Sequence, residues 1–237
     1  MKISLIIPAH NEEKIIGACL NDVILHSRGG FSEIIVVDNA STDNTSAVAA
    51  RFPEVKVVYE ERKGTNSARL RGLKESSGEL VAFFDADTRL PPKWIGIAEE
   101  VFSTHAGVVG LSGPYKYYDG TAFQKWTQNM FWWATAPIIW RVVGYMILGG
   151  NFVARRDILL KAGINPDITF YGDDTDIAKR LSKYGKVVFR MDFFTYSSMR
   201  RMLKAGLLKT NIIYCLNFFW PILFGRPFTK THDNIRS

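Results

Sequence analysis

Segments with the pattern of β-strands alternate with helical segments over the first 87 residues, and this order limits the fold more than any other feature. The strand-like runs, rich in Val, Ile and Phe, are residues 2–9, 32–40, 55–61 and 78–87. Apolar residues at helical spacing, or a Ser/Thr capping sequence, mark the intervening segments 12–27, 41–52 and 65–77. Because such alternation builds right-handed βαβ units, we predict an α/β fold with a largely parallel sheet.

Polar side chains follow each predicted strand. They are His10, Asn11 and Glu12 after the first, Asp38 and Asn39 after the second, Glu60 and Glu61 after the third, and Asp85 and Asp87 after the fourth. In parallel α/β sheets ligands bind outside the carboxyl ends of the strands, so we expect these groups to line one crevice. A solvated turn would explain Asp85 and Asp87 alone, but not the recurrence at every strand end. Their carboxylates are suitable ligands for Mg²⁺ or Mn²⁺.

The crevice lacks the two common glycine-rich phosphate motifs. No G-x-G-x-x-G and no G-x-x-x-x-G-K-[ST] occurs, which argues against a dinucleotide-binding fold and against a P-loop. Phosphates would then be held through a divalent cation and basic side chains such as Arg69 and Arg71. The net charge of +7 favours an anionic partner. Cys19 and Cys215 are far apart with no C-x-x-C spacing, which argues against a zinc site and suits a reducing compartment.

The second half of the chain contains another acidic cluster. We expect an extended segment over 107–120, a loop or short strand leading into a helix over 149–163, and a strand over 186–190. Asp173, Asp174 and Asp176 begin a predicted helix within 170–185. Helix capping and the helix dipole both favour negative charge there, but one or two carboxylates would suffice. Capping and a functional role therefore both remain open for these aspartates.

Five segments in this order resemble the family 2 glycosyltransferases of the GT-A fold, over about residues 2–190. They are IIPAHNEEKIIGACL, IIVVDNASTDNT, SARLRGLKESSGELVAFFDADTRL, GGNFVARR and YGDDTDIAKRL. The resemblance implies a nucleotide-sugar donor, a divalent metal (Mn²⁺ or Mg²⁺) and inversion at the anomeric carbon. A lone D-x-D motif is a weak signal, whereas five ordered segments together are specific.

The resemblance also assigns residues to the donor. It places Pro8, Ala9 and Glu12 beside the nucleoside and Asp38 on the base. Asp85 would face the ribose or a metal-bound water, and Asp87 would bind the metal that bridges the two phosphates. Arg69 matches the arginine of the family's A-R-N-x-G run, although Leu70 here replaces the asparagine. Arg200 and Arg201 would close over the diphosphate, as basic residues after the last strand do in similar enzymes.

On the acceptor side, the resemblance assigns Gly149, Gly150 and Asn151 to the acceptor loop. Asp174 matches the catalytic base of the family's E-D pair. Asp173 replaces the glutamate of that pair, so either aspartate is a candidate for the base. A base must reach the attacking hydroxyl, while the metal carboxylates must face the leaving group. The separation of Asp85 and Asp87 from Asp173 and Asp174 in sequence agrees with this division.

The predicted domain organisation has two parts. A GT-A catalytic domain covers 1–195, with a nucleotide-binding half (1–92) and an acceptor-binding half (93–195), and a basic, apolar helical tail covers 196–237. Two apolar stretches, 129–150 and 210–225, are interrupted and too short to span a bilayer. Basic and aromatic residues interleave over 196–230, which favours peripheral membrane contact over packing on the protein. We therefore expect a cytoplasmic protein on the inner face of the membrane.

The function predicted from these features is transfer of one sugar from a UDP- or GDP-linked donor to an acceptor hydroxyl. The Q-x-x-R-W segment that is usual in the family's processive synthases is missing, and membrane contact suits a lipid-linked or cell-envelope glycan. The alternatives are a polyprenyl-phosphate glycosyltransferase, a sugar nucleotidyltransferase, or a non-catalytic module that binds nucleotides or nucleic acid. No recognition helix or RNP-type aromatic pattern supports nucleic-acid binding, so no nucleic-acid partner is expected.

Overall fold

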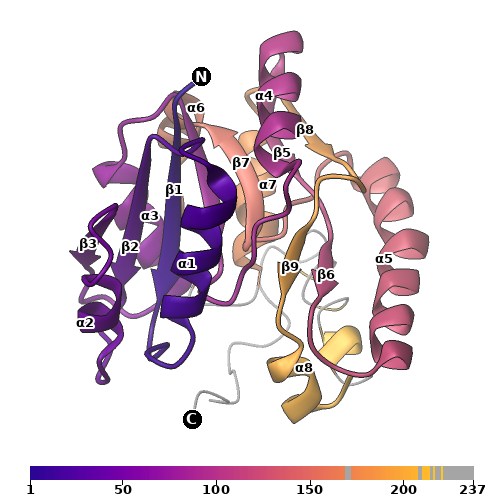
Figure 1. Cartoon of the computed structure of the whole chain (residues 1–237). Helices are drawn as coiled ribbons and strands as arrows, with labels where there is room; N and C mark the ends of the chain where they lie inside the picture. The colour runs from indigo at the N-terminus through magenta and orange to yellow at the C-terminus, as the bar shows by residue number, and fades with distance from the viewer. Residues whose placement is uncertain (169–171, 208–209, 214–215, 217–219, 221–237) are drawn as a thin grey trace.

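A computed structural model describes residues 1–168, 172–207, 210–213, 216 and 220. Its main element is a seven-stranded sheet in the order β3-β2-β1-β4-β7-β5-β8. These strands are β1 (Ile3–Ala9), β2 (Glu33–Asp38), β3 (Val55–Tyr59), β4 (Leu80–Phe84), β5 (Val108–Ser112), β7 (Asn151–Arg155) and β8 (Lys186–Phe189). A two-stranded parallel sheet, β6 (Tyr115–Tyr117) with β9 (Thr195–Ser197), lies beside it (Figure 1).

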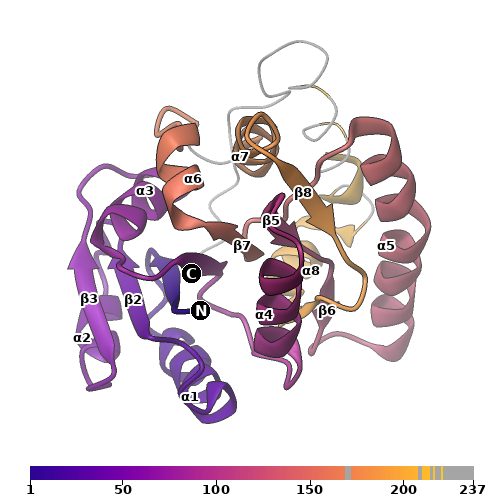
Figure 2. The same cartoon turned by 90° about the horizontal axis from the view of Figure 1, so that it is seen from above.

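The helices cover both faces of the main sheet. They are α1 (Ile16–Ser27), α2 (Thr45–Ala49), α3 (Thr65–Glu75), α4 (Trp94–Thr104), α5 (Ala122–Val143), α6 (Arg156–Ala162), α7 (Asp173–Leu181) and α8 (Arg200–Ala205). Seen from above, α1 and α4 lie on one side of the sheet and α3, α6 and α7 on the other (Figure 2). Alternate strand residues supply the two cores, as Leu5 and Ile7 pack with α1 and α4 while Ile6 packs with α3.

The sheet is largely parallel, as predicted, but one antiparallel strand makes it mixed. Four of its six strand pairings are parallel, but β7 runs antiparallel to both of its neighbours, β4 and β5. Because β7 lies between β4 and β5, a strand from the predicted acceptor half completes the sheet of the predicted nucleotide half. The predicted domain boundary at residue 195 falls within β9, so the first residues of the tail belong to the small sheet.

The two helices expected after β1 and β2 begin later than the sequence pattern indicates. Residues 11–15 and 41–44 instead form turns that hold each other. Thr42 donates its backbone N–H to Asn11 Oδ1 at 2.8 Å. Glu12 donates its backbone N–H to the side-chain oxygen of Thr45, also at 2.8 Å. These bonds pair backbone N–H groups that the first turn of a longer helix would leave without an intrahelical partner, so a turn takes the place of the first helical turn in each case.

Helix α5 contains most of the apolar stretch 129–150 but begins before it and ends before its last residues. It begins at a capping box in which the Thr121 side chain accepts from the Gln124 backbone N–H. It ends at Gly144, whose φ of 82° is the left-handed conformation that favours glycine. Among the helices of the described residues, none combines the length and apolar character needed to cross a bilayer. Most of the tail expected to contact the membrane, including 221–237, lies outside the described residues.

The side chain of Asn151, the first residue of β7, joins four segments in the core. It is fully buried, and its Oδ1 accepts the indole N–H of Trp94 at 2.8 Å. Its amide nitrogen donates to the carbonyl oxygens of Gly113, Pro114 and Phe193 at 3.0, 3.3 and 2.8 Å. These hydrogen bonds connect α4, the end of β5 and the approach to β9. An unpaired polar group in the core would destabilise the protein, so each of these bonds favours the folded state.

We therefore predict that replacing the Asn151 side chain causes a large loss of stability. Asn151→Ala removes four hydrogen bonds and leaves buried carbonyl and indole groups unpaired, which lowers the free energy of unfolding by about 2–5 kcal/mol. Urea unfolding followed by circular dichroism measures the change. The control is Asn21→Ala on the exposed side of α1, which should change the stability by less than about 0.5 kcal/mol. Equal effects of the two substitutions would contradict this role.

Candidate functional site

A cavity of about 670 Å³ opens at the carboxyl ends of β1, β2 and β4. Its polar end is lined by residues that follow these strands and by the start of α3, namely Pro8, Ala9, His10, Glu12, Asn39, Lys63, Gly64, Thr65, Arg69, Asp85 and Asp87. A second, largely apolar group of lining residues, which we call the apolar end, comprises Tyr117, Phe131, Trp132, Ile139, Met146, Ile147, Leu148 and Met202. Tyr115 lines the cavity beside Gly150. The cavity is also lined by Gly149, Gly150, Asp173, Asp174, Ser197, Ser198, Arg200 and Arg201. The crevice predicted at the strand ends is therefore present.

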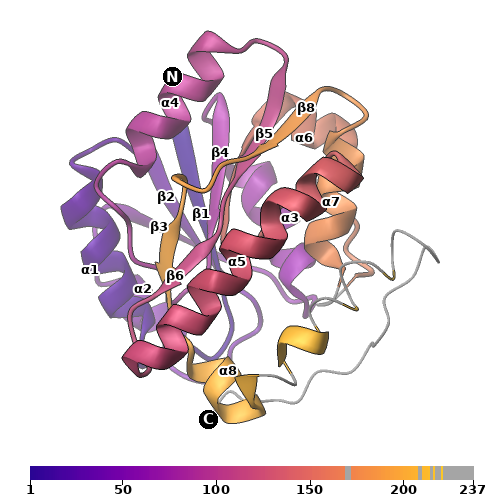
Figure 3. The same ribbon diagram turned by 90° about the vertical axis from the view of Figure 1, so that its right-hand side faces the viewer.

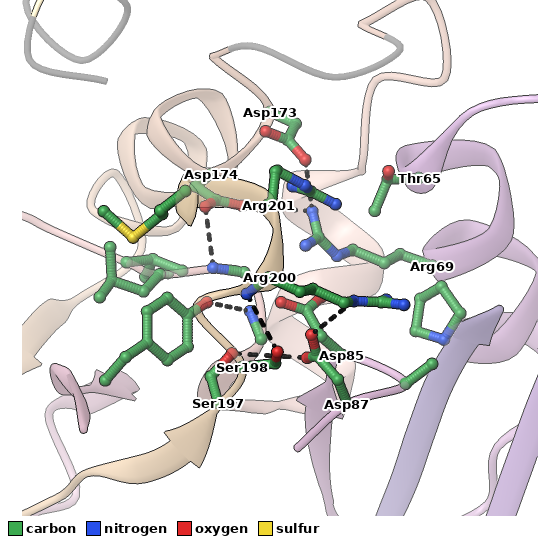
Figure 4. A pocket seen from close by; sticks show the side chains of 18 of the residues that line it. Thr65, Arg69, Asp85, Asp87, Asp173, Asp174, Ser197, Ser198, Arg200 and Arg201 are labelled. Atoms are coloured by element: carbon green, nitrogen blue, oxygen red, sulfur yellow. Dashed lines mark hydrogen bonds and ion pairs between the residues drawn. The ribbon is translucent and has the colours of Figure 1, made fainter. Parts of the chain in front are cut away.

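Asp85 and Asp87 lie together beyond the end of β4 (Figure 4). Only 14% of the Asp87 side chain is exposed. Burial and the neighbouring charge of Asp85 raise the pKa of Asp87 from its ordinary value of 3.8 to about 7, although the cations of Arg200 and Arg201 act in the opposite direction. At neutral pH this pair therefore favours an additional positive charge.

Arg200, at the start of α8, supplies a positive charge at this position. Its NH2 group donates to both carboxylate oxygens of the buried Glu12 at 2.7 and 2.8 Å. Its Nε lies 3.5 Å from Asp87 Oδ2 (Figure 4). Ser197 in β9 also donates to Asp87, at 3.4 Å. The end of the small sheet thus brings a guanidinium to carboxylates from β4 and from the turn after β1.

The acidic pair fits a divalent cation whose remaining ligands come from a substrate. No group of three or more His, Cys, Asp or Glu side chains in the described part of the chain is arranged as a complete metal site. Mg²⁺ is usually held by one or two carboxylates together with water and substrate phosphates, and Asp85 and Asp87 provide such a pair. The guanidinium of Arg200 beside Asp87 marks the position as one that accepts a cation.

A second acidic group lies at the start of α7. Asp173 Oδ2 accepts from Arg69 NH1 at 2.7 Å, and Asp174 Oδ1 accepts from the same nitrogen at 3.2 Å (Figure 4). Arg69 is 3% exposed, and although burial opposes it, the two aspartates hold the pKa of Arg69 above its ordinary value. Arg69, predicted to act at the donor, therefore binds the predicted catalytic carboxylates in this structure.

The two aspartates of this group differ in their surroundings. Asp173 is buried, and burial raises its pKa, against the effect of Arg69. Burial and the charge of Asp173 raise the pKa of Asp174 to about 7. About 31% of the Asp174 side chain is exposed, and it lines the cavity, which makes Asp174 the more accessible of the two. The raised pKa places its change of charge near neutral pH, as a general base requires.

Capping does not account for these two aspartates. The N-cap of α7 is Gly172, and no side chain makes a capping hydrogen bond there. Asp176, the third aspartate of the cluster, forms an ion pair with Arg180 one turn later at 2.6 Å. Only Asp173 and Asp174 line the cavity, so Asp176 is a helix-surface residue and the other two belong to the site.

Gly149 and Gly150 lie between the two acidic groups. The Gly149 N–H donates to Asp174 Oδ2, and the Gly150 N–H donates to the hydroxyl of Tyr115, both at 2.8 Å. A Cβ atom at Gly149 would collide with the guanidinium of Arg69 and with Asp174, and one at Gly150 would collide with the Asp85 carboxylate. A side chain at either position would therefore displace these groups, because the backbone passes directly between the carboxylates.

Several residues predicted or suggested for the site are placed elsewhere, among them Asn11, Glu60 and Glu61, which do not line the cavity. Asn151, predicted in the acceptor loop, is buried in the core by the contacts described above and does not line the cavity. Asp38 is buried and accepts the backbone N–H of Ser41 at 3.1 Å, while its neighbour Asn39 lines the cavity. Arg71, suggested for phosphate binding, is exposed and pairs with Glu75 at 3.1 Å.

Several cavity residues were not predicted. Lys63 and Thr65 follow β3, so the strand-end argument that identified the acidic residues also points to this loop. Tyr115 and Ser197 reach the cavity from the small sheet. No local sequence pattern marks these last two residues, because the pairing of β6 with β9 joins segments far apart in the chain.

Comparisons with known proteins identify relatives of this chain. Glycosyltransferase AglE of Haloferax volcanii is 29% identical over 191 residues, which are 77% of this chain and 62% of AglE. Dolichol-phosphate mannosyltransferase of Pyrococcus furiosus is 30% identical over 130 residues, which are 53% of this chain and 36% of that protein. The chain thus spans less than two thirds of the length of these curated relatives.

A solved structure has the same fold. The mannosyltransferase PcManGT of Pyrobaculum calidifontis, in complex with GDP-Man and Mn²⁺, matches with a TM-score of 0.70 at 19% identity, over 95% of this chain and 65% of that one. The mixed sheet flanked by helices is therefore of the GT-A type. The family model described as Glycosyl transferase family 2 matches residues 4–163, which contain the strand-end acids and the glycine loop. The chain therefore belongs to glycosyl transferase family 2.

Proposed function

We propose that this chain transfers a single sugar from a nucleotide-sugar donor, UDP- or GDP-linked, to an acceptor hydroxyl with inversion at the anomeric carbon. The observation that carries the proposal is that one cavity holds two separate acidic groups with the Gly149–Gly150 backbone between them. Neutralising a leaving diphosphate and removing a proton from an attacking hydroxyl require two such groups in different places. Family membership and the Mn²⁺ complex of PcManGT support this assignment.

The donor would occupy the polar end of the cavity. Its nucleoside would lie against Pro8, Ala9 and the loop that contains Lys63, and its diphosphate near Asp85 and Asp87, as these residues line that end. Asp85 and Asp87 would hold Mn²⁺ or Mg²⁺, which would neutralise the negative charge that develops on the leaving diphosphate. Asp38 would act indirectly, by holding the turn in which Asn39 lies.

Asp174 would act as the general base. The acceptor oxygen forms a bond to the anomeric carbon, the bond from that carbon to the diphosphate oxygen breaks, and the acceptor proton passes to Asp174. The Gly149 N–H and Arg69 hold this carboxylate in place. Asp173 is buried beside Arg69 and would set the orientation of that arginine, so we assign the base to Asp174.

The acceptor would enter the apolar end of the cavity. Aromatic and aliphatic side chains from α5 and the loop after it, such as Trp132 and Ile147, line this end. An acceptor with a hydrocarbon chain suits such a surface, so we propose a lipid-linked or cell-envelope glycan.

The apolar end of the cavity also supports a second candidate function, transfer of the sugar to a polyprenyl phosphate. This is the kind of transfer named for the dolichol-phosphate relative. A phosphate oxygen is already ionised and needs no base, so the two candidates differ in how strongly they depend on Asp174.

Removing the Asp87 carboxylate tests the metal site. Asp87→Asn should abolish the stabilisation of the protein by UDP or GDP with Mn²⁺, measured as the shift in melting temperature with and without the metal. The matched control is Asp176→Asn, because Asp176 pairs with Arg180 outside the cavity. This variant should keep the shift in melting temperature. If neither nucleotide stabilises the native protein with any metal, the donor assignment is wrong.

Asp87→Asn should also stabilise the ligand-free protein at alkaline pH. The raised pKa means that the folded state binds this proton more tightly than the unfolded state, so stability falls as pH rises from 3.8 to about 7 and stays low above it. The amide removes this loss, which raises the free energy of unfolding above pH 7 by about 1–4 kcal/mol and has little effect in acid. Urea unfolding across the pH range measures the difference, and an equal gain at every pH would contradict the electrostatic origin.

Asp174→Asn should separate binding from turnover. Loss of a general base lowers kcat by about 10²–10⁴-fold, while metal-dependent nucleotide binding is retained. In the native protein kcat/KM should rise with pH and reach a plateau above about 7, because the base works only when deprotonated. Product formation from a radiolabelled donor measures both. A small effect of Asp174→Asn together with full activity on a polyprenyl phosphate would favour the second candidate.

Arg200 is proposed to move from Glu12 and Asp87 to the donor diphosphate when the cation is bound. Arg200→Gln should then weaken the binding of UDP or GDP with Mn²⁺ by roughly 10–100-fold, since hydrogen bonds to charged groups contribute about 1.5–3 kcal/mol. Isothermal titration calorimetry measures the affinity. Arg71→Gln, which removes an arginine paired with Glu75 on the surface, is the control. Unchanged affinity in Arg200→Gln would show that Arg200 makes no contact with the donor.

A further inference from the structure

Helix α5 presents a row of large apolar side chains outward. Between 40% and 76% of each residue is exposed, a high fraction for side chains of this kind, and the row comprises Phe123, Trp126, Met130, Trp133, Ile138 and Val142. We call this row the outer face of α5. Steps of three and four residues place Phe123, Trp126, Met130 and Trp133 on one side of the helix, whereas the step of five that follows turns Ile138 and Val142 toward the neighbouring side. The six residues make up nearly half of the thirteen large apolar residues that are exposed in the described part of the chain.

The opposite side of α5 is also apolar, but it is covered. Ala136 is buried, and Phe131, Trp132 and Ile139 line the apolar end of the cavity. A helix that is apolar around its whole circumference normally has apolar surroundings on every side. Figure 3 shows α5 in front of the sheet on the outside of the molecule. Large apolar side chains gathered on an exposed helix in this way indicate a contact with an apolar partner.

The charges of this region indicate what that partner is. Helix α5 carries Lys125 and Arg141 and no Asp or Glu. Helix α8, near one end of α5 in Figures 1 and 3, carries three further cations in six residues and again no acid. Tryptophan, other apolar side chains and basic groups together are typical of helices that lie in the interface of an anionic membrane. A second copy of the chain would bring like charges together, which makes self-association unfavourable.

We propose that the outer face of α5 docks on the surface of an anionic phospholipid membrane, with the helix parallel to it. The exposed tryptophans would enter the headgroup region, and Lys125 and Arg141 of α5 and Lys204 of α8 would face anionic lipid. Because Trp132 and Ile139 on the inner side of the same helix line the cavity, docking places the apolar end of the cavity beside the membrane. The docking stands independently of catalysis, whereas its use for a lipid-linked acceptor rests on the proposed function.

Vesicle co-sedimentation of the full chain tests this proposal without any nucleotide or substrate. The native protein should sediment with phosphatidylcholine vesicles that contain phosphatidylglycerol, and less with vesicles of phosphatidylcholine alone or at high NaCl. The double variant Trp126→Glu/Trp133→Glu should lower the partition coefficient by roughly tenfold or more, because two exposed apolar anchors are lost. Emission from the native tryptophans should shift to the blue on vesicle addition, and this shift should shrink in Trp126→Phe/Trp133→Phe.

The control variant Leu25→Glu/Tyr59→Glu changes two equally apolar residues that are 71% and 61% exposed on α1 and β3, at the other end of the sheet. It should bind vesicles as the native protein does. Circular dichroism melting confirms that both variants fold. Native partition in the Trp126→Glu/Trp133→Glu variant would overturn the proposal, even if substitutions in the tail reduced binding. A dimer in light scattering that the α5 variant converts to monomer, without vesicle binding by the native protein, would also overturn it.

Discussion

The site depends on the neutralisation of carboxylates that the fold brings into one cavity. Five carboxylates from three separate parts of the chain line this cavity: Glu12, Asp85, Asp87, Asp173 and Asp174. Two guanidinium groups offset them. Arg69 lies between the start of α7 and the glycine loop, and Arg200 lies between Glu12 and Asp87. Without such cations, the desolvation and mutual repulsion of the carboxylates would oppose folding of this edge of the sheet.

The two arginines provide this charge in different ways. Arg69 is on α3, is almost fully buried and is fixed by packing, so it forms a permanent part of the site. Arg200 is on a short helix after β9, and its side chain is 40% exposed. A cation bound with a donor would replace the charge that Arg200 supplies and leave this arginine available to the diphosphate. The raised pKa of Asp87 indicates that Arg200 and Arg201 neutralise this carboxylate only in part.

Helix α5 connects this chemistry to the outside of the molecule. Its inner side closes the apolar end of the cavity, and its outer face carries exposed aromatic and aliphatic groups. Trp140 fastens it to the edge of the main sheet through a hydrogen bond to the carbonyl oxygen of Val187 at 3.0 Å. A single helix thus separates the cavity proposed to receive an amphipathic acceptor from the surface proposed to contact lipid.

Much of the fold and of the candidate site could be predicted from the sequence, because local sequence patterns indicate local geometry. The alternation of strands and helices predicts the α/β layers, and the strand ends predict the crevice with Asp85 and Asp87. What the pattern cannot supply is the partner of a side chain, which depends on strand order and helix orientation. Arg69 and Arg71 are two residues apart, so they point to nearly opposite sides of α3, one to the cavity and one to solvent.

Long-range pairing decided the remaining features. Asn151 lies in the core because β7 is inserted antiparallel between β4 and β5, which turns this side chain toward Trp94 on α4. Arg200 meets Glu12 across 188 residues of sequence because the small sheet carries α8 back to the end of β1. The sequence by itself determined the fold class, the family and the two acidic groups. Only the tertiary structure decided which cations neutralise them, because contacts between distant segments follow from register and packing rather than from local periodicity.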